Sequence, residues 1–232
     1  MINKKEKAIT HILADFEEFA NLILQQLDIL EKFINSDEIK ISDKIYQEIV
    51  ENEKKFDLFE VEISERIIKT IILYHPLASD LRKIMTCYRI SLNLERIGDK
   101  IMNIVNFIKS INEPSLYLDL KDVISQMLSY SIKMVSKSLI SFINSDKDFA
   151  IWTIKNDEVV DELNKKSLTK VIRKGKMTKE TQQLLFNFLN TKEIISNIER
   201  IADQATNIAE ASFYAIEGKD IRHKEINDIN SH

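Results

Sequence analysis

A ten-residue motif that occurs twice is the feature that most constrains how this chain folds. Its first copy, at residues 95–104, reads ERIGDKIMNI, and its second copy, at residues 199–208, reads ERIADQATNI. The copies begin at Glu95 and Glu199, which are 104 residues apart in a chain of 232. Repetition on this scale indicates a tandem duplication. The sequence therefore predicts two halves with the same fold and similar chemistry.

Both copies have the residue spacing of a packed helix. Apolar residues recur at alternating intervals of three and four, which places them on one side of a helix. The two stripes are Ile90, Leu94, Ile97, Ile101, Ile104 and Ile108, and Ile194, Ile198, Ile201, Ala205 and Ile208. Turns consume glycine and proline, and the chain has only three glycines and two prolines. The composition therefore favours an all-α protein of long helices joined by few loops.

Capping and helix-breaking residues divide the chain into six expected helices. The pentapeptide FINSD closes the first helix of each half, at residues 33–37 and 142–146. Pro76 suits the first turn of a helix, and Gly175 and Gly218 suit helix ends. We expect helices over residues 5–34, 42–75, 76–111, 116–143, 148–173 and 178–217. The prediction is two tandem three-helix bundles, at residues 1–113 and 114–219, followed by a polar tail at residues 220–232.

Charge and cysteine content exclude several classes of protein. The chain has 33 basic and 37 acidic residues, a net charge of −4, which does not favour nucleic-acid binding. Cys87 is the only cysteine, so there is no disulfide framework and no cysteine-based zinc site, and we expect this side chain to be buried. The sequence shows no signal peptide and no apolar stretch long enough to span a membrane. We therefore expect a cytoplasmic protein.

Paired carboxylates are the strongest indication of chemistry in this sequence. The 104-residue offset relates an acidic pair on the second helix of each half, and the repeated motif supplies another pair on the third helix. Residues four apart share a helix face, and neighbouring helices pack about 8–10 Å apart, so facing pairs can enclose a cation. The predicted ligands are Glu53, Asp57, Glu95, Asp99, Asp157, Asp161, Glu199 and Asp203, with Asn103 and Asn207 as supporting residues. Such all-oxygen sites suit a hard divalent metal or iron.

A second interpretation of the carboxylates stays open. Acidic residues four apart are common on solvated helix faces, and Arg96 and Arg200 can simply pair with Asp99 and Asp203. The basic stretch at residues 165–179 also has two interpretations. It either opposes the dipole of a helix end or forms a docking patch for an acidic partner or an anionic membrane.

Several enzyme classes lack their motifs in this chain. Helical di-iron oxidases use Glu-x-x-His, and no glutamate stands three residues before any of the four histidines. No serine or cysteine forms a convincing nucleophilic set with histidine, and the isolated glycines cannot form a phosphate-binding loop. We therefore do not expect catalysis.

The repeated motif, extended to residue 210, resembles the paired signatures of the PhoU family of phosphate-uptake regulators. HPLASDLR at residues 75–82 resembles the segment before the first signature, and GKDIRH at residues 218–223 resembles the family's ending. The resemblance covers almost the whole chain. It implies two three-helix bundles related by a pseudo-twofold axis, no enzymatic activity, and iron- or zinc-type metal clusters at the eight carboxylates. The chain departs from the family pattern at Glu53, which is often Asp, and at Leu184 and Phe186, where the second half lacks counterparts of Asp80 and Arg82.

The resemblance also implies the function and the partners. The predicted function is negative regulation of phosphate uptake and phosphate-responsive signalling, without catalysis. The implied partners are the ATPase subunit of a phosphate ABC transporter and a sensor histidine kinase, together with a second copy of the chain. Contact with the membrane is expected only through these partners. The alternatives are an accessory protein of a low-affinity phosphate or metal transporter, and a carboxylate-based metal-binding or storage protein.

Overall fold

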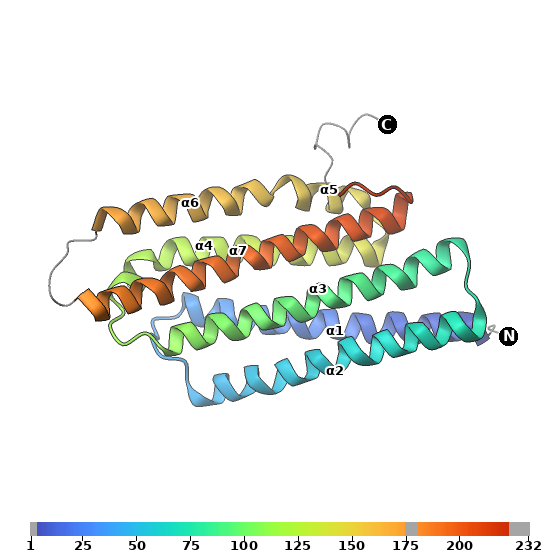
Figure 1. The fold of residues 1–232 in the computed structure, drawn as a ribbon, viewed down its shortest axis with the longest axis horizontal. Coiled ribbons are helices and arrows are strands. Elements are labelled where there is room, and N and C mark those ends of the chain that lie inside the picture. The colour runs from blue at the N-terminus through green and yellow to red at the C-terminus, as the bar shows by residue number, and fades with distance from the viewer. Residues whose placement is uncertain (1–3, 175–180, 223–232) are drawn as a thin grey trace.

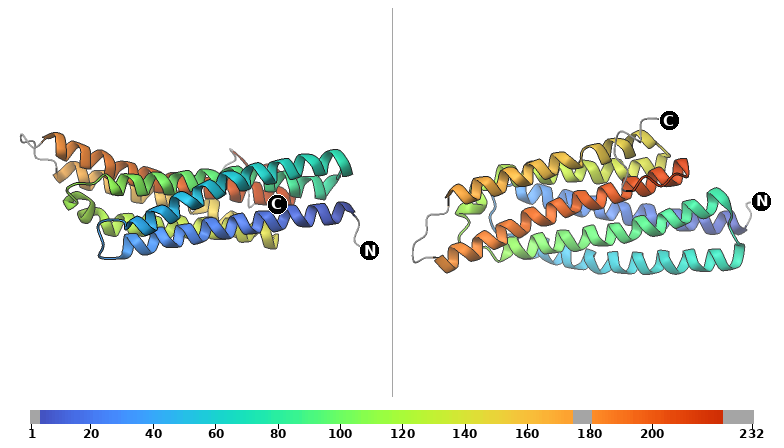
Figure 2. Two further views of the ribbon diagram at one scale, coloured as in Figure 1. Left: turned by 90° about the horizontal axis from the view of Figure 1, so that it is seen from below. Right: turned by 45° about the horizontal axis from the view of Figure 1, so that its top comes forward.

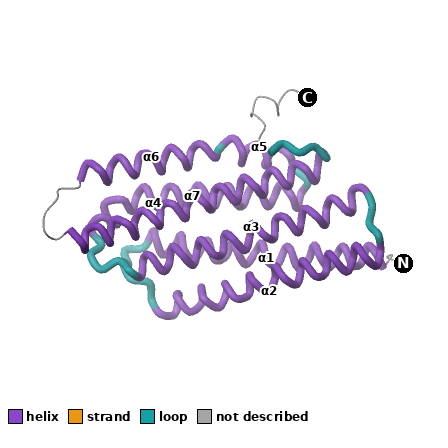
Figure 3. Tube along the Cα trace, in the orientation of Figure 1, coloured by secondary structure: helices purple, strands orange, loops and turns teal. Residues whose placement is uncertain are grey.

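The structure is a computed structural model that describes residues 4–174 and 181–222, with side chains omitted at residues 167–184. The described residues form helices and loops without a strand (Figures 1 and 3). The helices are α1 (Lys4–Asn35), α2 (Asp43–Tyr74), α3 (Ala78–Lys109), α4 (Ser115–Asn144), α5 (Lys147–Lys155), α6 (Asp157–Lys174) and α7 (Thr181–Glu217). The prediction of an all-α protein is confirmed.

The helices form two groups that share one core. In the first group α1, α2 and α3 pack on one another, and in the second group α4 and α7 pack together with α5 and α6 along them. The groups meet where α3 lies against α7 and α1 lies against α4 (Figure 2). Phe16 of α1 and Phe142 of α4 touch edge to face across this boundary, with ring centroids 5.2 Å apart. The apolar core is therefore continuous between the two halves.

The stripes expected from the sequence are the buried faces of the helices. The isoleucines and leucines of the stripe on α3 are almost fully buried, and so is the corresponding stripe on α7. Cys87 lies in the same core, where burial raises the pKa of its thiol to about 12. A thiol with so high a pKa is chemically inert, as expected for a small core residue.

Core residues at repeat-equivalent positions differ in size between the two halves. Phe56 of α2 lies against Gly98 of α3, and a Cβ placed on this glycine would come within 2.4 Å of the ring carbon Cδ2. At the equivalent positions of the second half stand Val160 and Ala202, both buried. A large residue beside a glycine in one half thus corresponds to a smaller residue and an alanine in the other.

The prediction that Pro76 begins the third helix is wrong. Pro76 lies in the turn between α2 and α3, and α3 begins only at Ala78. His75 closes α2 in the left-handed conformation, with φ 44°, and its N–H donates to the carbonyl of Ile71. Leu77 is extended, and Ala78 itself has φ 49°. The connection therefore has one left-handed residue at the end of α2 and a second at Ala78, the first residue of α3.

The fifth predicted helix, over residues 148–173, is interrupted at Asn156 and forms α5 and α6. The Asn156 side chain donates from Nδ2 to the carbonyl of Trp152 at 2.7 Å and accepts from the Tyr130 hydroxyl at 2.7 Å. Asparagine side chains that bond to nearby backbone compete with helical hydrogen bonds. The second half therefore contains four helices in the described residues, where three were predicted. Gly175, predicted as a helix end, lies outside the described residues.

Candidate cation site: two acidic clusters

Each half of the molecule brings its predicted carboxylates together between two packed helices. In the first half α2 carries one row and α3 the other, and in the second half α6 and α7 carry them. We call the sets the first acidic cluster (Glu53, Asp57, Glu95 and Asp99) and the second acidic cluster (Asp157, Asp161, Glu199 and Asp203). The repeat offset placed these residues on the correct pairs of helices.

The carboxylates of the first acidic cluster repel one another. Partial loss of hydration raises the pKa of Glu53, and repulsion by Asp57 and Asp99 raises it further. The pKa of Glu95 is raised by the same loss of hydration, then by Asp99, Asp57 and Glu60, while Arg96 lowers it. All four predicted members therefore interact across the α2–α3 boundary. Glu60 joins them and was not predicted from the sequence.

The second acidic cluster is also strained electrostatically. Loss of hydration raises the pKa of Asp157, a hydrogen bond from Thr206 lowers it, and repulsion by Asp161 and Glu199 raises it. The pKa of Asp203 is raised to about 6 by loss of hydration and by repulsion from the other three carboxylates. Asp203 keeps an exposed edge, although the neighbouring helix removes water from part of its surroundings.

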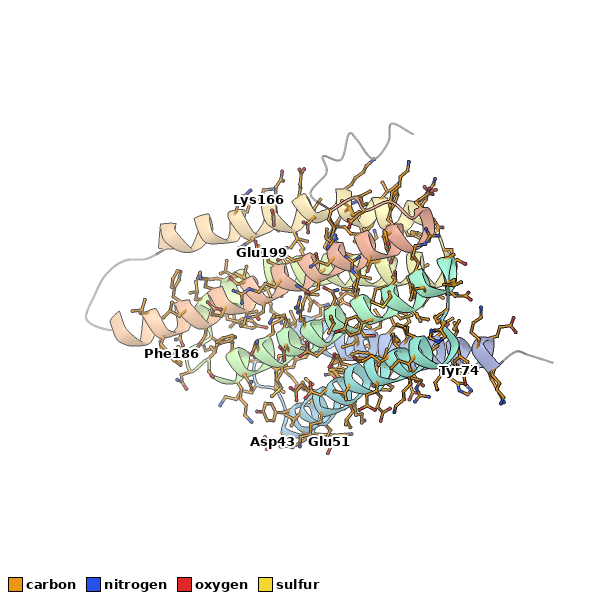
Figure 4. All side chains as sticks on the ribbon, turned by 45° about the vertical axis from the view of Figure 1, so that its right-hand side comes forward. Asp43, Glu51, Tyr74, Lys166, Phe186 and Glu199 are labelled. Carbon is orange, nitrogen blue, oxygen red and sulfur yellow. The ribbon has the colours of Figure 1, made fainter. Side chains whose placement is uncertain are left out.

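Hydrogen-bond donors distinguish the second cluster from the first. Asn164 of α6 donates from Nδ2 to Glu199 Oε2 at 2.5 Å, so Glu199 reaches from α7 to α6 (Figure 4). Thr206 donates from Oγ1 to Asp157 Oδ1 at 3.1 Å. The repeat-equivalent residues in the first half are Glu60 and Met102. The first cluster therefore has an additional carboxylate where the second has an amide, and it lacks the hydroxyl donor.

The arginines of the repeated motif do not neutralise the clusters by contact. Arg96 and Arg200 are exposed, and neither forms an ion pair with a described carboxylate. They act only at longer range, where Arg96 lowers the pKa of Glu95 and Arg200 that of Asp203. The interpretation in which each arginine pairs with the nearby aspartate therefore does not describe this structure.

The donor chemistry fits a hard cation, whereas the present side-chain positions do not form a coordination sphere. Clustered carboxylates with raised pKa values favour a positive charge between them. Among residues 4–174 and 181–222, however, no three Asp, Glu, His or Cys side chains converge closely enough to hold a metal ion. Asn103 and Asn207 lie one turn beyond the rows, and no hydrogen bond joins them to a carboxylate of the residues that the structure describes. Metal binding at the two clusters therefore stays a prediction.

Two other sequence motifs meet at the end of the bundle. Gly218 follows α7 with φ 70°, and a Cβ placed on it would come within 2.2 Å of Nη1 of Arg82. Arg82 belongs to the segment at residues 75–82, so the two shorter motifs lie against each other across the two halves. Asp220 pairs with Arg222, and that pair holds the pKa of the Asp220 carboxyl well below its usual range.

The basic stretch at residues 165–179 is described only at its beginning. Lys165 and Lys166 are exposed on α6, and Lys166 lies 3.6 Å from Glu162 (Figure 4). The remaining side chains of the predicted docking patch lie outside the described residues. None of the described helices has the length and apolar character needed to cross a membrane.

Comparison with known proteins identifies relatives along almost the entire chain. The PhoU domain matches twice, at residues 16–108 and 124–212. The phosphate-specific transport system accessory protein PhoU homolog of Aquifex aeolicus is 33% identical over 91% of this chain and 92% of its own length. PhoU homolog 1 of Thermotoga maritima is 26% identical over 94% of this chain and 90% of its own length.

Solved structures share the fold. The crystal structure of PhoU from Pseudomonas aeruginosa superposes with a TM-score of 0.79 at 24% identity, over 92% of this chain and 99% of that one. The phosphate transport system regulatory protein PhoU from Streptococcus pneumoniae superposes equally well, with a TM-score of 0.79 at 21% identity, over 94% of this chain and 99% of that one. The duplicated motif thus coincides with two copies of a known helical domain.

Proposed function

This chain belongs to the PhoU family, and on that premise we propose that it is a cytoplasmic, non-enzymatic negative regulator of phosphate uptake. The observation that carries the proposal is the double match to the PhoU domain, at residues 16–108 and 124–212. Each match contains one copy of the repeated acidic motif. Relatives that align over nine-tenths of the chain are named as accessory proteins of the phosphate-specific transport system.

The proposed partners are the ATPase subunit of a phosphate ABC transporter and a sensor histidine kinase. When phosphate is plentiful, the protein would restrain the transporter and keep phosphate-responsive genes repressed. Deletion of the gene should then raise phosphatase expression in high-phosphate medium, and the intact gene supplied in trans should restore repression. Unchanged repression in the deletion strain would refute the regulatory role.

Direct partner binding requires a separate measurement. Affinity purification of the tagged chain from cells grown at high and low phosphate should recover the transporter ATPase and the kinase. Recovery of a low-affinity phosphate or metal transporter instead would favour the alternative accessory function. Binding assays with the purified chain and each purified partner should then distinguish direct binding from capture through a third protein.

We further propose that the two acidic clusters bind divalent metal ions, including iron or zinc. The support is the set of four interacting carboxylates in each half, whose charge is poorly neutralised by described cations. Binding requires side-chain movement toward a shared ion, because carboxylates must converge on it to coordinate. The chain itself would supply oxygen ligands, and the ion would hold α2 to α3 and α6 to α7.

Elemental analysis after purification without chelators tests this metal binding. Asp99→Ala combined with Asp203→Ala should lower the metal content, since each removes one ligand from one cluster. Unchanged metal content would refute the assignment of these sites. Metal that accumulates in large excess over the two clusters would instead favour the storage function.

A further inference from the structure

Two arginines near the start of α3 contact no carboxylate in the part of the chain that the structure describes. Arg82 and Arg89 are seven residues apart, which is two helical turns, so they lie on the same side of α3. Neither side chain forms an ion pair or a hydrogen bond with a described residue. Both residues are partly buried, so each guanidinium has lost some of the water that stabilises its charge.

Carboxylates at this end of the bundle are paired with other cations. The ion pairs are Lys5–Asp80 at 2.6 Å, Lys147–Glu217 at 3.0 Å, and Arg222–Asp220, in which Nε lies 2.9 Å from Oδ1. The pKa of Arg222 is raised by Asp220 and further by Glu210, so both of these carboxylates act on that guanidinium. Arg82 and Arg89 therefore keep positive charges that none of these acids neutralises by contact.

Buried hydrogen-bond donors without an acceptor accompany the two arginines. Nε of Arg82 is buried and has no hydrogen-bond partner, and the same is true of Oγ1 of Thr86. Thr86 is only 1% exposed, and it stands four residues after Arg82 and three before Arg89. The three side chains therefore share one side of the helix. Buried polar groups in folded proteins normally have a partner, so two orphaned donors here indicate that an acceptor is missing.

The segment that follows α7 is held in place opposite these residues. α7 ends beside the beginning of α3 (Figures 1 and 2), where Arg82 packs so closely on Gly218 that a Cβ there would lie 2.2 Å from Nη1. Ile221 is buried against Ala209 and anchors the segment. The pKa of the Asp220 carboxyl is lowered mainly by its bonds to Arg222 and also by the charge of Arg89. Both arginines of α3 therefore face residues 218–222.

The internal repeat shows that the fold does not require this pair of arginines. Phe186 and Glu193 stand at the equivalent positions of α7. Phe186 is 45% exposed, and Glu193 lies 3.6 Å from Lys192. The second half thus has an aromatic ring and a negative charge where the first half has two positive charges. The difference points to a use of Arg82 and Arg89 that is specific to the first half.

We propose that Arg82 and Arg89 bind a phosphate dianion beside the turn that follows α7. A guanidinium presents a planar fork of N–H donors that matches the oxygens of phosphate. The anion would neutralise both arginines and would supply the acceptors that Arg82 Nε and Thr86 Oγ1 lack. Long side chains two turns apart on one side of a helix can converge on one small tetrahedral ligand.

The proposed site joins the two halves of the molecule. Its arginines belong to α3 of the first half, and residues 218–222 follow the last helix of the second half. The dianion is either free inorganic phosphate or a phosphomonoester, since both present the same group. The inference rests on the contacts of these side chains and not on the proposed regulatory function, so either can fail without the other.

Isothermal titration calorimetry of the full chain tests the site. The protein is treated with chelator and dialysed, so that metal ions do not carry phosphate to the acidic clusters, and sodium phosphate is titrated at constant ionic strength. The wild-type chain should bind one phosphate. Arg82→Gln and Arg89→Gln should each weaken binding at least about tenfold, because each removes charge-assisted hydrogen bonds. Arg200→Gln is the matched control, since Arg200 is exposed elsewhere on α7 and its loss should leave binding unchanged.

Thermal unfolding separates loss of the site from loss of the fold. Phosphate should raise the melting temperature of the wild-type chain and of Arg200→Gln, and it should not raise that of Arg82→Gln or Arg89→Gln. Thr86→Val keeps the shape of the side chain without the hydroxyl, so it should weaken phosphate binding while the ligand-free protein stays folded.

A parallel titration with phosphoserine distinguishes the two sources of the dianion. Tighter binding of phosphoserine would assign the site to a phosphomonoester, and tighter binding of phosphate would assign it to the free anion. Absence of binding by both compounds at millimolar concentration would overturn the proposal. Binding that folded Arg82→Gln and Arg89→Gln proteins retain at wild-type strength would do the same.

Discussion

Gly98→Ala is the substitution for which the structure makes the sharpest prediction. The new methyl group would lie 2.4 Å from Cδ2 and 3.1 Å from Cε2 of Phe56, both far inside contact distance. Phe56 is only 2% exposed, so its ring cannot turn toward solvent. Forcing extra volume into a packed core costs about 1–3 kcal/mol. Alanine in mid-helix regains about 1 kcal/mol over glycine. We therefore expect a net loss of about 0–2 kcal/mol in the free energy of unfolding.

A double-mutant cycle isolates the contact between Phe56 and Gly98. Phe56→Val alone should lose about 2–3 kcal/mol, because it removes buried ring carbons and leaves a cavity. Phe56→Val with Gly98→Ala reproduces the valine–alanine pair of the second half and should lose less than the sum of the single losses. The coupling should be about 1–3 kcal/mol. Urea denaturation followed by circular dichroism measures all four proteins.

The reverse substitutions at the equivalent positions of the second half are the control for this double-mutant cycle. Val160→Phe should be destabilising, and Ala202→Gly should rescue much of the loss by making room for the ring. A Gly98→Ala protein at least as stable as the wild type, together with additive losses in both cycles, would refute the idea that these positions compensate for one another.

Three further substitutions test other parts of the structure. Asp203→Asn should raise the melting temperature at neutral pH in chelator-treated protein. The pKa of Asp203 rises from 3.8 to about 6 on folding, so its charge destabilises the fold fully above pH 6 and not at all below pH 4, where the difference between variant and wild type should vanish. Gly218→Ala should lower the free energy of unfolding, measured by thermal denaturation, by about 1–2 kcal/mol, because φ is 70° and the methyl group would clash with Arg82. Asn156→Leu should lose about 1–2 kcal/mol, because the partly buried Tyr130 hydroxyl loses its acceptor, and the companion Tyr130→Phe should then cost little more.

Long-range features of this fold were readable from the sequence because the repeat supplies an internal alignment. The apolar intervals on α3 and α7 located the buried faces, and the 104-residue offset placed Glu53 and Asp157 on equivalent helices. Both predictions depend only on spacing. The packing of α2 on α3 and of α6 on α7 then brings each row of carboxylates beside its partner.

Features that depend on a distant residue were not predicted. At the helix break, the Asn156 side chain bonds to the Trp152 carbonyl and also accepts from the hydroxyl of Tyr130, 26 positions earlier, which only the folded chain brings near. Glu60 belongs to the first acidic cluster because its charge raises the pKa of Glu95 on the neighbouring helix. The spacing of four residues that identified the acidic pairs does not include Glu60. The exposed apolar residues on the outer face of α2, such as Leu58 at 61% exposed, were not predicted, because intervals of three and four residues do not distinguish a buried helix face from an exposed one.

The contact between α3 and α7 has an evolutionary consequence. These helices are repeat-equivalent, as are α1 and α4. At both places where the halves join, a helix therefore packs against its own repeat equivalent. Surfaces that pair with themselves are typical of symmetric homodimers. An ancestor with a single repeat could have formed a homodimer through this face, and gene duplication and fusion would then have joined the two copies in one chain. Dividing the present chain near residue 113 would then produce two fragments, each with an exposed apolar face that the other half covers in the intact chain.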